Sequence, residues 1–317
     1  MQKYFLLLFI LFPKLINAQS RETILLGQGD VYDFRFSPQG SLAYVASGKS
    51  VNIWDIYKKV QIGSLEDGPD NTINSLDITK DSSFLVASSL DSIIAIWNLS
   101  NFTLLKKIKI NSIANKVLFN DNGSSIVAGL RNGELLSINS FTGEVIIRKE
   151  TNLTEVTGLA LLDSSDLLAA SGPKGIVQLW NTNSFTIYDQ KKSHSDFVRE
   201  LVFTKDGQRL YSCGDDGKVI CCNIKNNKLG KGDNVRSNLN KPWIMSMDIM
   251  DPRIIAYADL RGEIVLDNYV LKYSYHLPNA IFKLHFLPQK SQYMAVGIAT
   301  SDGLKIIWAS KMKSKSI

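Results

Sequence analysis

Three cysteines and three histidines are the residues of this 317-residue chain best suited to catalysis or metal binding. A nucleophilic triad needs a serine or cysteine activated by a histidine, and the sequence has no Gly-x-Ser-x-Gly turn. Cys221 and Cys222 are adjacent, so in a strand they face opposite sides, and we expect Cys222 to be a small buried apolar residue. Cys213 and Cys221 either form a disulfide across neighbouring strands or stay free. We predict no catalytic residue.

Metal and cofactor motifs are equally scarce. His276 and His285 are nine residues apart and His194 is distant, with no Cys-x-x-Cys pair, His-Glu-x-x-His helix or calcium-loop spacing. Asp215 and Asp216 are adjacent carboxylates at a predicted hairpin tip, where turn chemistry is favoured over acid catalysis. The glycines mark turns and form no phosphate-binding loop. We therefore predict no metal site and no cofactor.

Composition and charge place the chain among folded proteins. Apolar residues make up 44% of the chain and charged residues 21%, which excludes disorder. The formal net charge is +6; without Lys3 and Lys14 the chain keeps 34 basic and 30 acidic residues, a net charge of +4. So mild an excess does not favour nucleic acid as a partner.

The first eighteen residues have the order of a cleavable export signal. Lys3 precedes an apolar run from Tyr4 to Phe12, and a short polar stretch ends at Ala18. Nine apolar residues cover about half of the ~20 that a membrane-spanning helix needs. We therefore expect residues 1–18 to be removed, residues 19–317 to form one domain that does not insert into a membrane, and the protein to be secreted or periplasmic.

A repeat of about 42 residues runs through the rest of the chain. Four tryptophans end similar apolar runs, and three other residues fill the gaps in the period: Trp54, Trp97, Ile138, Trp180, Cys222, Asp267 and Trp308, spaced by 43, 41, 42, 42, 45 and 41. A second marker, an apolar residue before a polar turn, recurs at Phe36, Ile78, Phe119, Leu161, Phe203, Ile249 and Phe286. Both markers indicate seven units.

Each unit has the pattern of four short strands. In the fourth unit the alternation of apolar and polar residues predicts strands at 156–161, 167–171, 176–180 and 185–188. Four strands repeated at this period predict an all-β, seven-bladed β-propeller. The last unit has no apolar fourth strand, and Thr23–Leu26 is spare, so we expect this segment to pair with the last blade and close the ring. The tryptophans are expected to pack between blades.

The repeats resemble the WD40 family. The resemblance rests on Trp54-Asp55, on the weaker Trp97-Asn98 and Trp180-Asn181, and on the turn Ser37-Pro38-Gln39-Gly40. In the fifth unit His194, Ser212 and Asp216 are similar to the hydrogen-bonded histidine, serine and aspartate of that family, although Cys222 replaces its tryptophan. The resemblance implies that the loops before each first strand and between the second and third strands share one face.

Partner-binding residues are expected on that face. Trp243 lies outside the repeat, so it either packs on a blade or projects as a partner anchor. The candidate rim residues are Asp70, Arg131, Lys174, Phe197, Asp216, Trp243 and Arg261. We interpret the protein as a non-enzymatic scaffold for protein partners. The alternatives are a propeller enzyme of the lactonase, glycosidase or quinone-dependent type, and glycan or small-ligand binding in the channel; no repeated inward pattern of acids and histidines is evident in the sequence.

Overall fold

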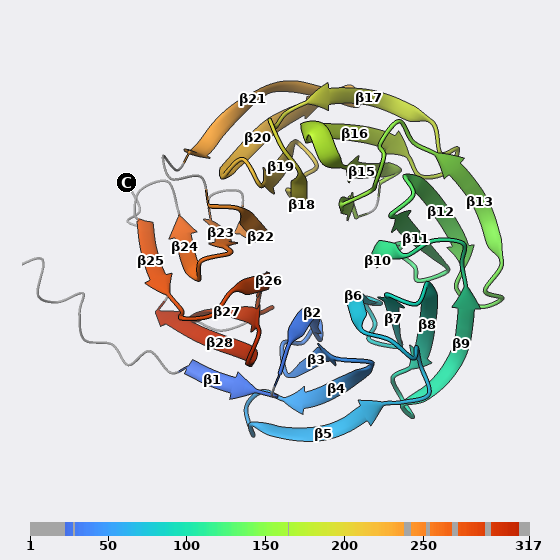
Figure 1. Cartoon of the computed structure of the whole chain (residues 1–317), viewed down its shortest axis with the longest axis vertical. Helices are drawn as coiled ribbons and strands as arrows, with labels where there is room; N and C mark the ends of the chain where they lie inside the picture. The colour runs from blue at the N-terminus through green and yellow to red at the C-terminus, as the bar shows by residue number, and fades with distance from the viewer. Residues whose placement is uncertain are drawn as a thin grey trace, which may run out of the picture.

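The chain forms seven four-stranded antiparallel sheets arranged in a ring, as predicted (Figure 1). This computed structural model describes residues 23–27, 29–163, 165–237, 242–251, 254–267, 272–288 and 293–310. The predicted signal peptide, residues 1–18, and the basic tail after residue 310 lie outside the described residues. We number the blades from 1 to 7 in the order of their innermost strands.

Blades 1 to 3 follow one another along the chain. Blade 1 comprises β2 (Val31–Phe36), β3 (Leu42–Ser47), β4 (Ser50–Asp55) and β5 (Val60–Leu65). Blade 2 comprises β6 (Ile73–Ile78), β7 (Phe84–Ser89), β8 (Ile93–Asn98) and β9 (Thr103–Lys109). Blade 3 comprises β10 (Ala114–Phe119), β11 (Ser125–Leu130), β12 (Glu134–Asn139) and β13 (Val145–Glu150). In each blade the chain runs from the channel outward, so the first strand lines the channel and the fourth lies on the rim of the ring (Figure 1).

Blades 4 to 7 repeat this order. They comprise β14 (Gly158–Leu161), β15 (Leu167–Ser171), β16 (Ile176–Asn181) and β17 (Ile187–Lys192); β18 (Val198–Phe203), β19 (Arg209–Gly214), β20 (Lys218–Lys225) and β21 (Lys228–Ser237); β22 (Ile244–Asp251), β23 (Ile254–Asp259), β24 (Glu263–Asp267) and β25 (Lys272–His276); and β26 (Ile281–Phe286), β27 (Tyr293–Thr300), β28 (Gly303–Ser310) and β1 (Thr23–Leu26). The one helix of the described residues is the single 3-10 turn Pro173–Gly175. It is far too short to cross a membrane, and no described helix has the length and apolar character to do so.

The ring is closed by β1, as the sequence predicted. It pairs antiparallel with β28 from Thr23 opposite Ile307 to Leu26 opposite Leu304. Leu26 is fully buried in the core that also contains Val31 and Phe34 of blade 1. The fourth strand of blade 7 thus comes from the opposite end of the chain and covers an edge that would otherwise be open for pairing.

The hydrophobic core lies between neighbouring blades. Trp97 of β8 is fully buried in a cluster that includes Ile53 of blade 1 and Leu76 of blade 2. Its indole N–H donates to the carbonyl of Glu66 at 2.9 Å, and a Cβ at Gly68 would lie 2.3 Å from its ring, so the preceding segment can pass only with a glycine there. The predicted packing role of the blade tryptophans Trp54, Trp97, Trp180 and Trp308 is confirmed, since all four belong to or pack against interblade cores.

Two strands of blade 4 begin two residues later than predicted. The first strand begins at Gly158, where residue 156 was expected. The fourth strand of blade 4 begins at Ile187, two residues later than expected, because Phe185 adopts a positive φ of 49° in the preceding turn. Its side chain is nevertheless buried, beside Trp180 in the interblade core. Phe185 therefore packs in the core although its backbone lies in a turn. The alternating pattern alone could not distinguish such a turn residue from a strand residue.

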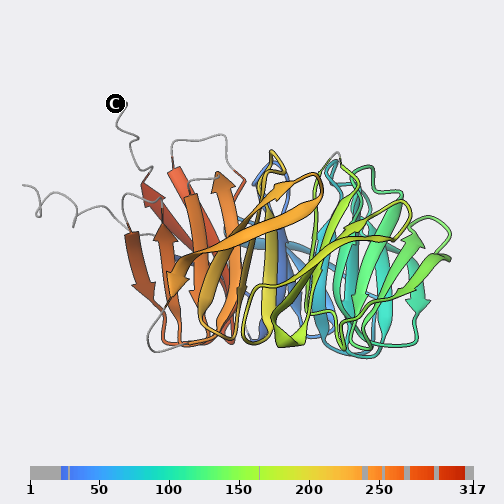
Figure 2. The same ribbon diagram turned by 90° about the horizontal axis from the view of Figure 1, so that it is seen from above.

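Loops cover the two flat faces of the ring (Figure 2). Because all four strands of a blade are antiparallel, the connection that enters each first strand lies at the same end as the connection between the second and third strands. We call the face that carries these connections the loop face. It includes the segments around Asp70, Phe197 and Trp243.

Candidate functional site

Six of the seven predicted rim residues are accessible on the loop face. Phe197 is half-buried, and 46% of the Trp243 side chain is exposed. The other four are charged, and all four are exposed: Asp70, Arg131, Lys174 and Arg261. These residues come from different blades, so the ring as a whole positions them, although they do not all form one contiguous site.

Asp216 is the exception, and its predicted exposure was wrong. It retains only 7% exposure, and its carboxylate interacts with His194 Nδ1 at 2.9 Å and accepts the N–H of Ser195 at 3.1 Å. Burial alone would raise the pKa of Asp216, but these hydrogen bonds to His194 and Ser195 outweigh it and lower that pKa. The carboxylate therefore fastens a loop instead of meeting a partner.

The predicted hydrogen-bonded set of His194, Ser212 and Asp216 is confirmed. His194 Nε2 lies 2.8 Å from Ser212 Oγ on the side opposite Asp216. These are the contacts of a nucleophilic triad, but His194 is buried and its ring faces no opening. Cys222, at the tryptophan position of this blade, is also buried, as predicted. The set joins the loop before β18 to strand β19 and to the turn between β19 and β20.

An aromatic cluster occupies the loop face between blades 5 and 6. The guanidinium carbon of Arg199, the second residue of β18, lies 5.3 Å from the centre of the Phe197 ring and 5.6 Å from that of Trp243. Phe197 and Trp243 precede the first strands of blades 5 and 6, so one arginine joins two neighbouring entry loops. We call Phe197, Arg199 and Trp243 the aromatic cluster.

Asp215 fixes the orientation of Arg199. Its two carboxylate oxygens accept hydrogen bonds from Nε at 2.7 Å and Nη2 at 2.5 Å of Arg199. Asp215 is buried, whereas 31% of the Arg199 side chain remains exposed. These hydrogen bonds raise the pKa of Arg199, so its charge is permanent. A two-point contact of this kind holds the planar guanidinium in place between the rings.

Further apolar side chains continue along this part of the loop face. The rings of Tyr32 and Phe282, the second residues of β2 and β26, lie in tilted contact, with centres 5.1 Å apart and an interplanar angle of 39°. Leu260 is exposed and donates its backbone N–H to the carbonyl of Trp243 at 3.0 Å. The sequence analysis did not single out these three residues. Their positions could have indicated them: Leu260 is an apolar residue in a turn, and Tyr32 and Phe282 are apolar residues near the loop-face end of an innermost strand.

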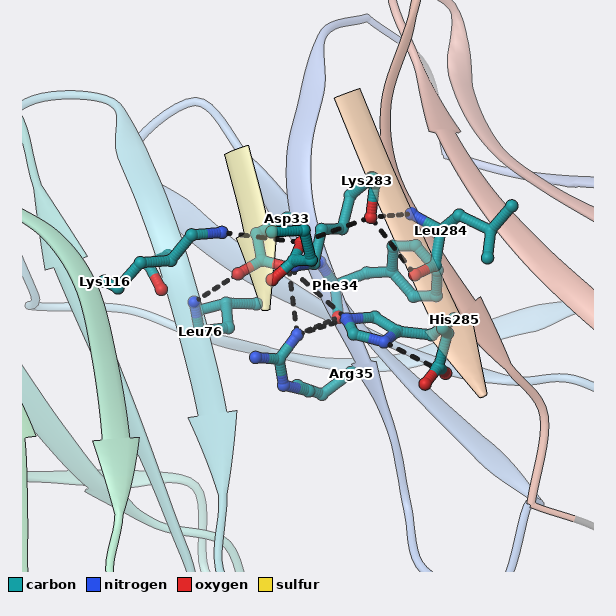
Figure 3. Close-up of polar contacts among 12 residues, drawn as sticks. Asp33, Phe34, Arg35, Leu76, Lys116, Lys283, Leu284 and His285 are labelled. Carbon is teal, nitrogen blue, oxygen red and sulfur yellow. Dashed lines mark hydrogen bonds and ion pairs between the residues drawn. The ribbon is translucent and has the colours of Figure 1, made fainter. Parts of the chain in front are cut away.

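The channel contains the inward pattern that the sequence analysis failed to recognise (Figure 3). Polar and charged side chains occupy the third and fifth positions of the innermost strands: Asp33 and Arg35, Ser75 and Asp77, Lys116, Glu200, Ser246 and Asp248, and Lys283 and His285. Six of the seven innermost strands carry one or two of them, β14 (Gly158–Leu161) carries none, and their types differ between blades. The period becomes visible only when the strands are superposed.

Several of these side chains join one blade to the next. The innermost strand of a blade has one edge without a neighbouring strand, so its N–H groups need other acceptors. Side chains of the preceding blade accept them: Asp33 from Leu76 at 2.9 Å, Ser75 from Val117 at 3.3 Å, Asp77 from Phe119 at 2.7 Å, Ser246 from Leu284 at 3.2 Å and Asp248 from Phe286 at 2.8 Å. The acidic residues of the channel thus have a structural use.

Glu200 of β18 is the centre of an ion network that crosses the channel. Lys283 of β26 donates a hydrogen bond to its carboxylate, and Lys116 of β10 lies 3.9 Å from the same oxygen. Burial would raise the pKa of Glu200, but the two lysines outweigh it and lower that pKa. Burial lowers the pKa of Lys116 to about 8, because Glu200 compensates for it only in part. Blades 3, 5 and 7 therefore meet through one carboxylate.

Arg35 of β2 is the centre of a second group of charges. It contacts Asp33 at 3.1 Å, Asp77 at 3.2 Å and the imidazole of His285. Burial would raise the pKa of Asp33, but Arg35 and the nearby lysines outweigh it and lower that pKa to about 2. Burial and the charge of Arg35 lower the pKa of His285. The channel charges are thus engaged with one another.

Metal and thiol chemistry find no support in the described part of the chain. No group of three or more histidines, cysteines, aspartates or glutamates is arranged to hold a metal ion there. All three cysteines are free: Cys213 pairs with Val219 and Cys221 with Tyr211, so the two are not opposite each other in the sheet. Burial raises the pKa of each thiol, which disfavours the reactive thiolate.

The sequence family agrees with this architecture. The model of the WD domain, G-beta repeat, matches residues 20–55, 59–98 and 186–223. These ranges contain strands β1 to β4, β5 to β8, and β17 to β19 with most of β20. The chain is a WD40-like seven-bladed β-propeller. The three matched regions include two blades that keep the tryptophan and the one that keeps His194, Ser212 and Asp216. The other blades of this propeller have diverged further.

The chain is similar in sequence to several known proteins. It is 22% identical over 134 residues to WD repeat-containing protein 55 of Arabidopsis thaliana, 42% of this chain and 37% of that protein. It is 26% identical over 166 residues to nuclear pore complex protein nup43 of Dictyostelium discoideum, 50% and 40% of the two chains. These alignments span less than half of either relative. A longer alignment, 65% of this chain and 71% of the relative at 22% identity, is to the target of rapamycin complex subunit LST8 of Saccharomyces cerevisiae.

A solved propeller shares the fold. The β-propeller domain of Cps50 (Swd1) from Myceliophthora thermophila superposes with a TM-score of 0.81, covering 92% of this chain and all of that chain at 14% identity. This likeness concerns the fold alone.

Proposed function

We propose that this propeller is an exported, non-enzymatic scaffold that binds a protein partner on its loop face. The observation that carries the proposal is the aromatic cluster. Trp243 is large, accessible and held beside an arginine whose position Asp215 fixes, so it offers a rigid contact at little cost in side-chain entropy. Tryptophan and arginine are the residue types most often found to dominate binding energy at protein interfaces.

Two observations support a role in binding over one in catalysis. The channel charges are paired with one another and hold the blades together, and the triad-like set of His194, Ser212 and Asp216 is buried. Two similar proteins, the nuclear pore complex protein and the target of rapamycin complex subunit, are named as parts of assemblies. We extend to this propeller a role within a protein assembly, with neither nucleic acid nor membrane lipid as its partner.

The export part of the proposal rests on residues 1–18. Their order of charge, apolar run and small residue predicts removal after Ala18. Mass spectrometry of the protein isolated from its own cells should find an N-terminus at Gln19 in the secreted or envelope fraction. An intact N-terminus in the cytosolic fraction would contradict export and leave the binding proposal standing.

Affinity capture tests the binding part. Wild-type propeller and the Trp243→Ala/Arg261→Ala variant are used as baits on the native secreted or envelope fraction. We expect the wild type to recover a specific protein that the variant loses, because the variant removes the exposed indole and an exposed guanidinium of the same loop face. Recovery of the same proteins by both baits would contradict a partner site at this cluster.

A further inference from the structure

Charged side chains are unevenly distributed over the loop face. Around the aromatic cluster four basic residues end strands or occupy turns: Lys174, Lys192, Lys218 and Arg261. Three of them are exposed and Lys218 is half-buried. We call these four residues the basic arc. It extends over blades 4 to 6, and Phe197, Arg199 and Trp243 lie on blades 5 and 6.

Most acidic residues in the turns of this region are withdrawn from the surface. Asp215 is bound to Arg199, Asp216 to His194, and Asp259 is buried and accepts the N–H groups of Arg261 and Glu263. Asp196, in the loop before β18, remains exposed. Glu155, in the loop before β14, and Glu263, the first residue of β24, are half-buried. Among the fully exposed residues of this region, three basic side chains of the basic arc therefore face one acidic side chain, Asp196.

The opposite part of the loop face has the reverse character. The connection between β5 and β6 exposes Glu66, Asp67 and Asp70, and Asp30 is exposed just before β2. Lys107, which lies 3.5 Å from Asp70, and the exposed Lys49 in the turn between β3 and β4 offset part of this charge. The separation of charge across one face gives the face an electrostatic direction, which orients an approaching partner before contact.

From this distribution we infer that the loop face binds an acidic segment of its partner, which places an aromatic or aliphatic side chain against Trp243 and its carboxylates along the basic arc. The inference rests on the proposed function and names the chemistry of its partner. Trp243, Phe197 and Leu260 supply the apolar contact, and Lys174, Lys192 and Arg261 lie around it. Exposed aromatic surface ringed by one sign of charge is complementary to a segment with apolar anchors and the opposite charge.

Fluorescence anisotropy with short labelled peptides tests this inference. The probe carries glutamates on both sides of a central Leu-Phe pair. One comparison peptide replaces the glutamates by lysines, and another replaces Leu-Phe by Ser-Ser. We expect the wild-type propeller to bind the first peptide and to bind both comparison peptides at least about tenfold more weakly. Equal binding of the lysine peptide would overturn the inference.

Protein variants locate the site. Trp243→Ala should weaken the glutamate peptide by about thirtyfold, as expected for a central anchor. Arg261→Glu should weaken it by about tenfold at low salt, with a smaller effect at high salt because surface charges are screened. Lys49→Glu is the matched control, since it makes the same charge change at an exposed turn of blade 1 on the same face. Equal losses for Arg261→Glu and Lys49→Glu would contradict binding at the basic arc.

Two further outcomes separate this inference from the proposed function. If the wild type captures a partner through Trp243 but the glutamate peptide does not displace it, the scaffold role stands and the acidic segment is wrong. If the peptide binds at Trp243 but no partner is captured, the chemistry of the surface stands and the scaffold role loses support. Concentration-dependent dimers that Asp70→Lys dissociates would show that a second copy occupies the site through its acidic side, which would also overturn the inference.

Discussion

The channel and the aromatic cluster both contain a buried carboxylate paired with a basic side chain, but the pairs have different roles. In the channel Glu200 is buried between Lys283 and Lys116, and each charge contacts groups of other blades. In the cluster Asp215 is equally buried, but its partner Arg199 is partly exposed and carries an aromatic ring on two sides. Both sites pair a buried carboxylate with a cation. They differ in the exposure of that cation, which is low in the channel and higher in the aromatic cluster.

This difference separates groups that hold the fold from groups that can meet a partner. A charge surrounded by protein contributes through the pairs it forms there, and removal of the carboxylate shared by two lysines leaves both lysines without compensation. An arginine fixed by a buried aspartate keeps a defined position while its free surface stays available for contact.

The largest expected loss of stability comes from Glu200→Gln. Lys283 and Lys116 would keep their charges in the channel without a carboxylate between them, and we expect the free energy of unfolding to fall by about 3 to 5 kcal/mol. Urea denaturation at neutral pH measures it. Asp70→Asn, which removes a solvent-exposed carboxylate 3.5 Å from Lys107, serves as control and should cost less than about 1 kcal/mol. A loss of stability for Glu200→Gln that is as small as that for Asp70→Asn would contradict the structural role of the network.

Arg199→Met should cost somewhat less, about 2 to 4 kcal/mol, because Asp215 would remain buried without its guanidinium. The double variant Arg199→Met/Asp215→Asn should recover most of this stability, since the uncompensated charge is gone, while binding of the glutamate peptide stays weak. Urea denaturation and anisotropy on the same samples distinguish the two effects. If the double variant is no more stable than the single one, Asp215 does more than orient Arg199.

Lys116→Met should raise the free energy of unfolding moderately, whereas the two preceding substitutions lower it. The pKa of Lys116 is lowered to about 8 by burial, so between about pH 8 and 10.5 the unfolded chain binds more protons than the folded one. Stability from this residue therefore rises with pH across that window and is lowest below it. At pH 7 the variant should be more stable than the wild type by about 1 to 3 kcal/mol.

The pH dependence checks this assignment. The difference in unfolding free energy between Lys116→Met and the wild type should shrink as the pH is raised from 8 toward 10.5. Glu200, Lys283, Asp33 and Arg35 face the same group and are present in both proteins, so their titration largely cancels in the comparison. A variant that is less stable than the wild type at pH 7 would show that Lys116 is a net favourable partner of Glu200.

The smallest expected effect on stability is that of Trp243→Ala. Its side chain is 46% exposed, so we expect a loss below about 1 kcal/mol, although capture and peptide binding should fall sharply. Trp97→Ala is the matched comparison: this side chain is fully buried between blades 1 and 2, and its removal should cost about 3 to 5 kcal/mol. Similar thermal shifts for both variants would place Trp243 in the core and remove it from the binding surface.

The sequence predicted the blades well because each repeat carries its own local signals. The tryptophan period and the polar turns indicated seven units, and the missing fourth strand of the last unit indicated the closure by Thr23–Leu26. The same signals placed Phe185 in a strand, although it reaches the core from a turn with a positive φ. A pattern of burial along the chain reports which residues are inside, and it reports less reliably on the backbone conformation that brings them there.

The candidate site was predicted only in part. Trp243 stood out because it breaks the repeat, and Phe197, Lys174 and Arg261 followed from their loops. Arg199 was missed because nothing in its local sequence shows that it lies between two aromatic rings from different blades. Asp216 was placed on the surface because a turn residue is usually exposed, while in the folded protein His194 covers it.

The sequence alone determined the number of blades, their strand content and the way the ring closes, since these follow from short-range alternation and a regular period. Only the tertiary structure decided which charged side chains pair with one another in the interior and which remain accessible to solvent. Residues such as Glu200, Lys116 and Lys283 lie far apart along the chain and meet only because the ring brings the innermost strands around one axis. Burial and distance between such residues are properties of the closed ring, and no segment of the sequence carries them by itself.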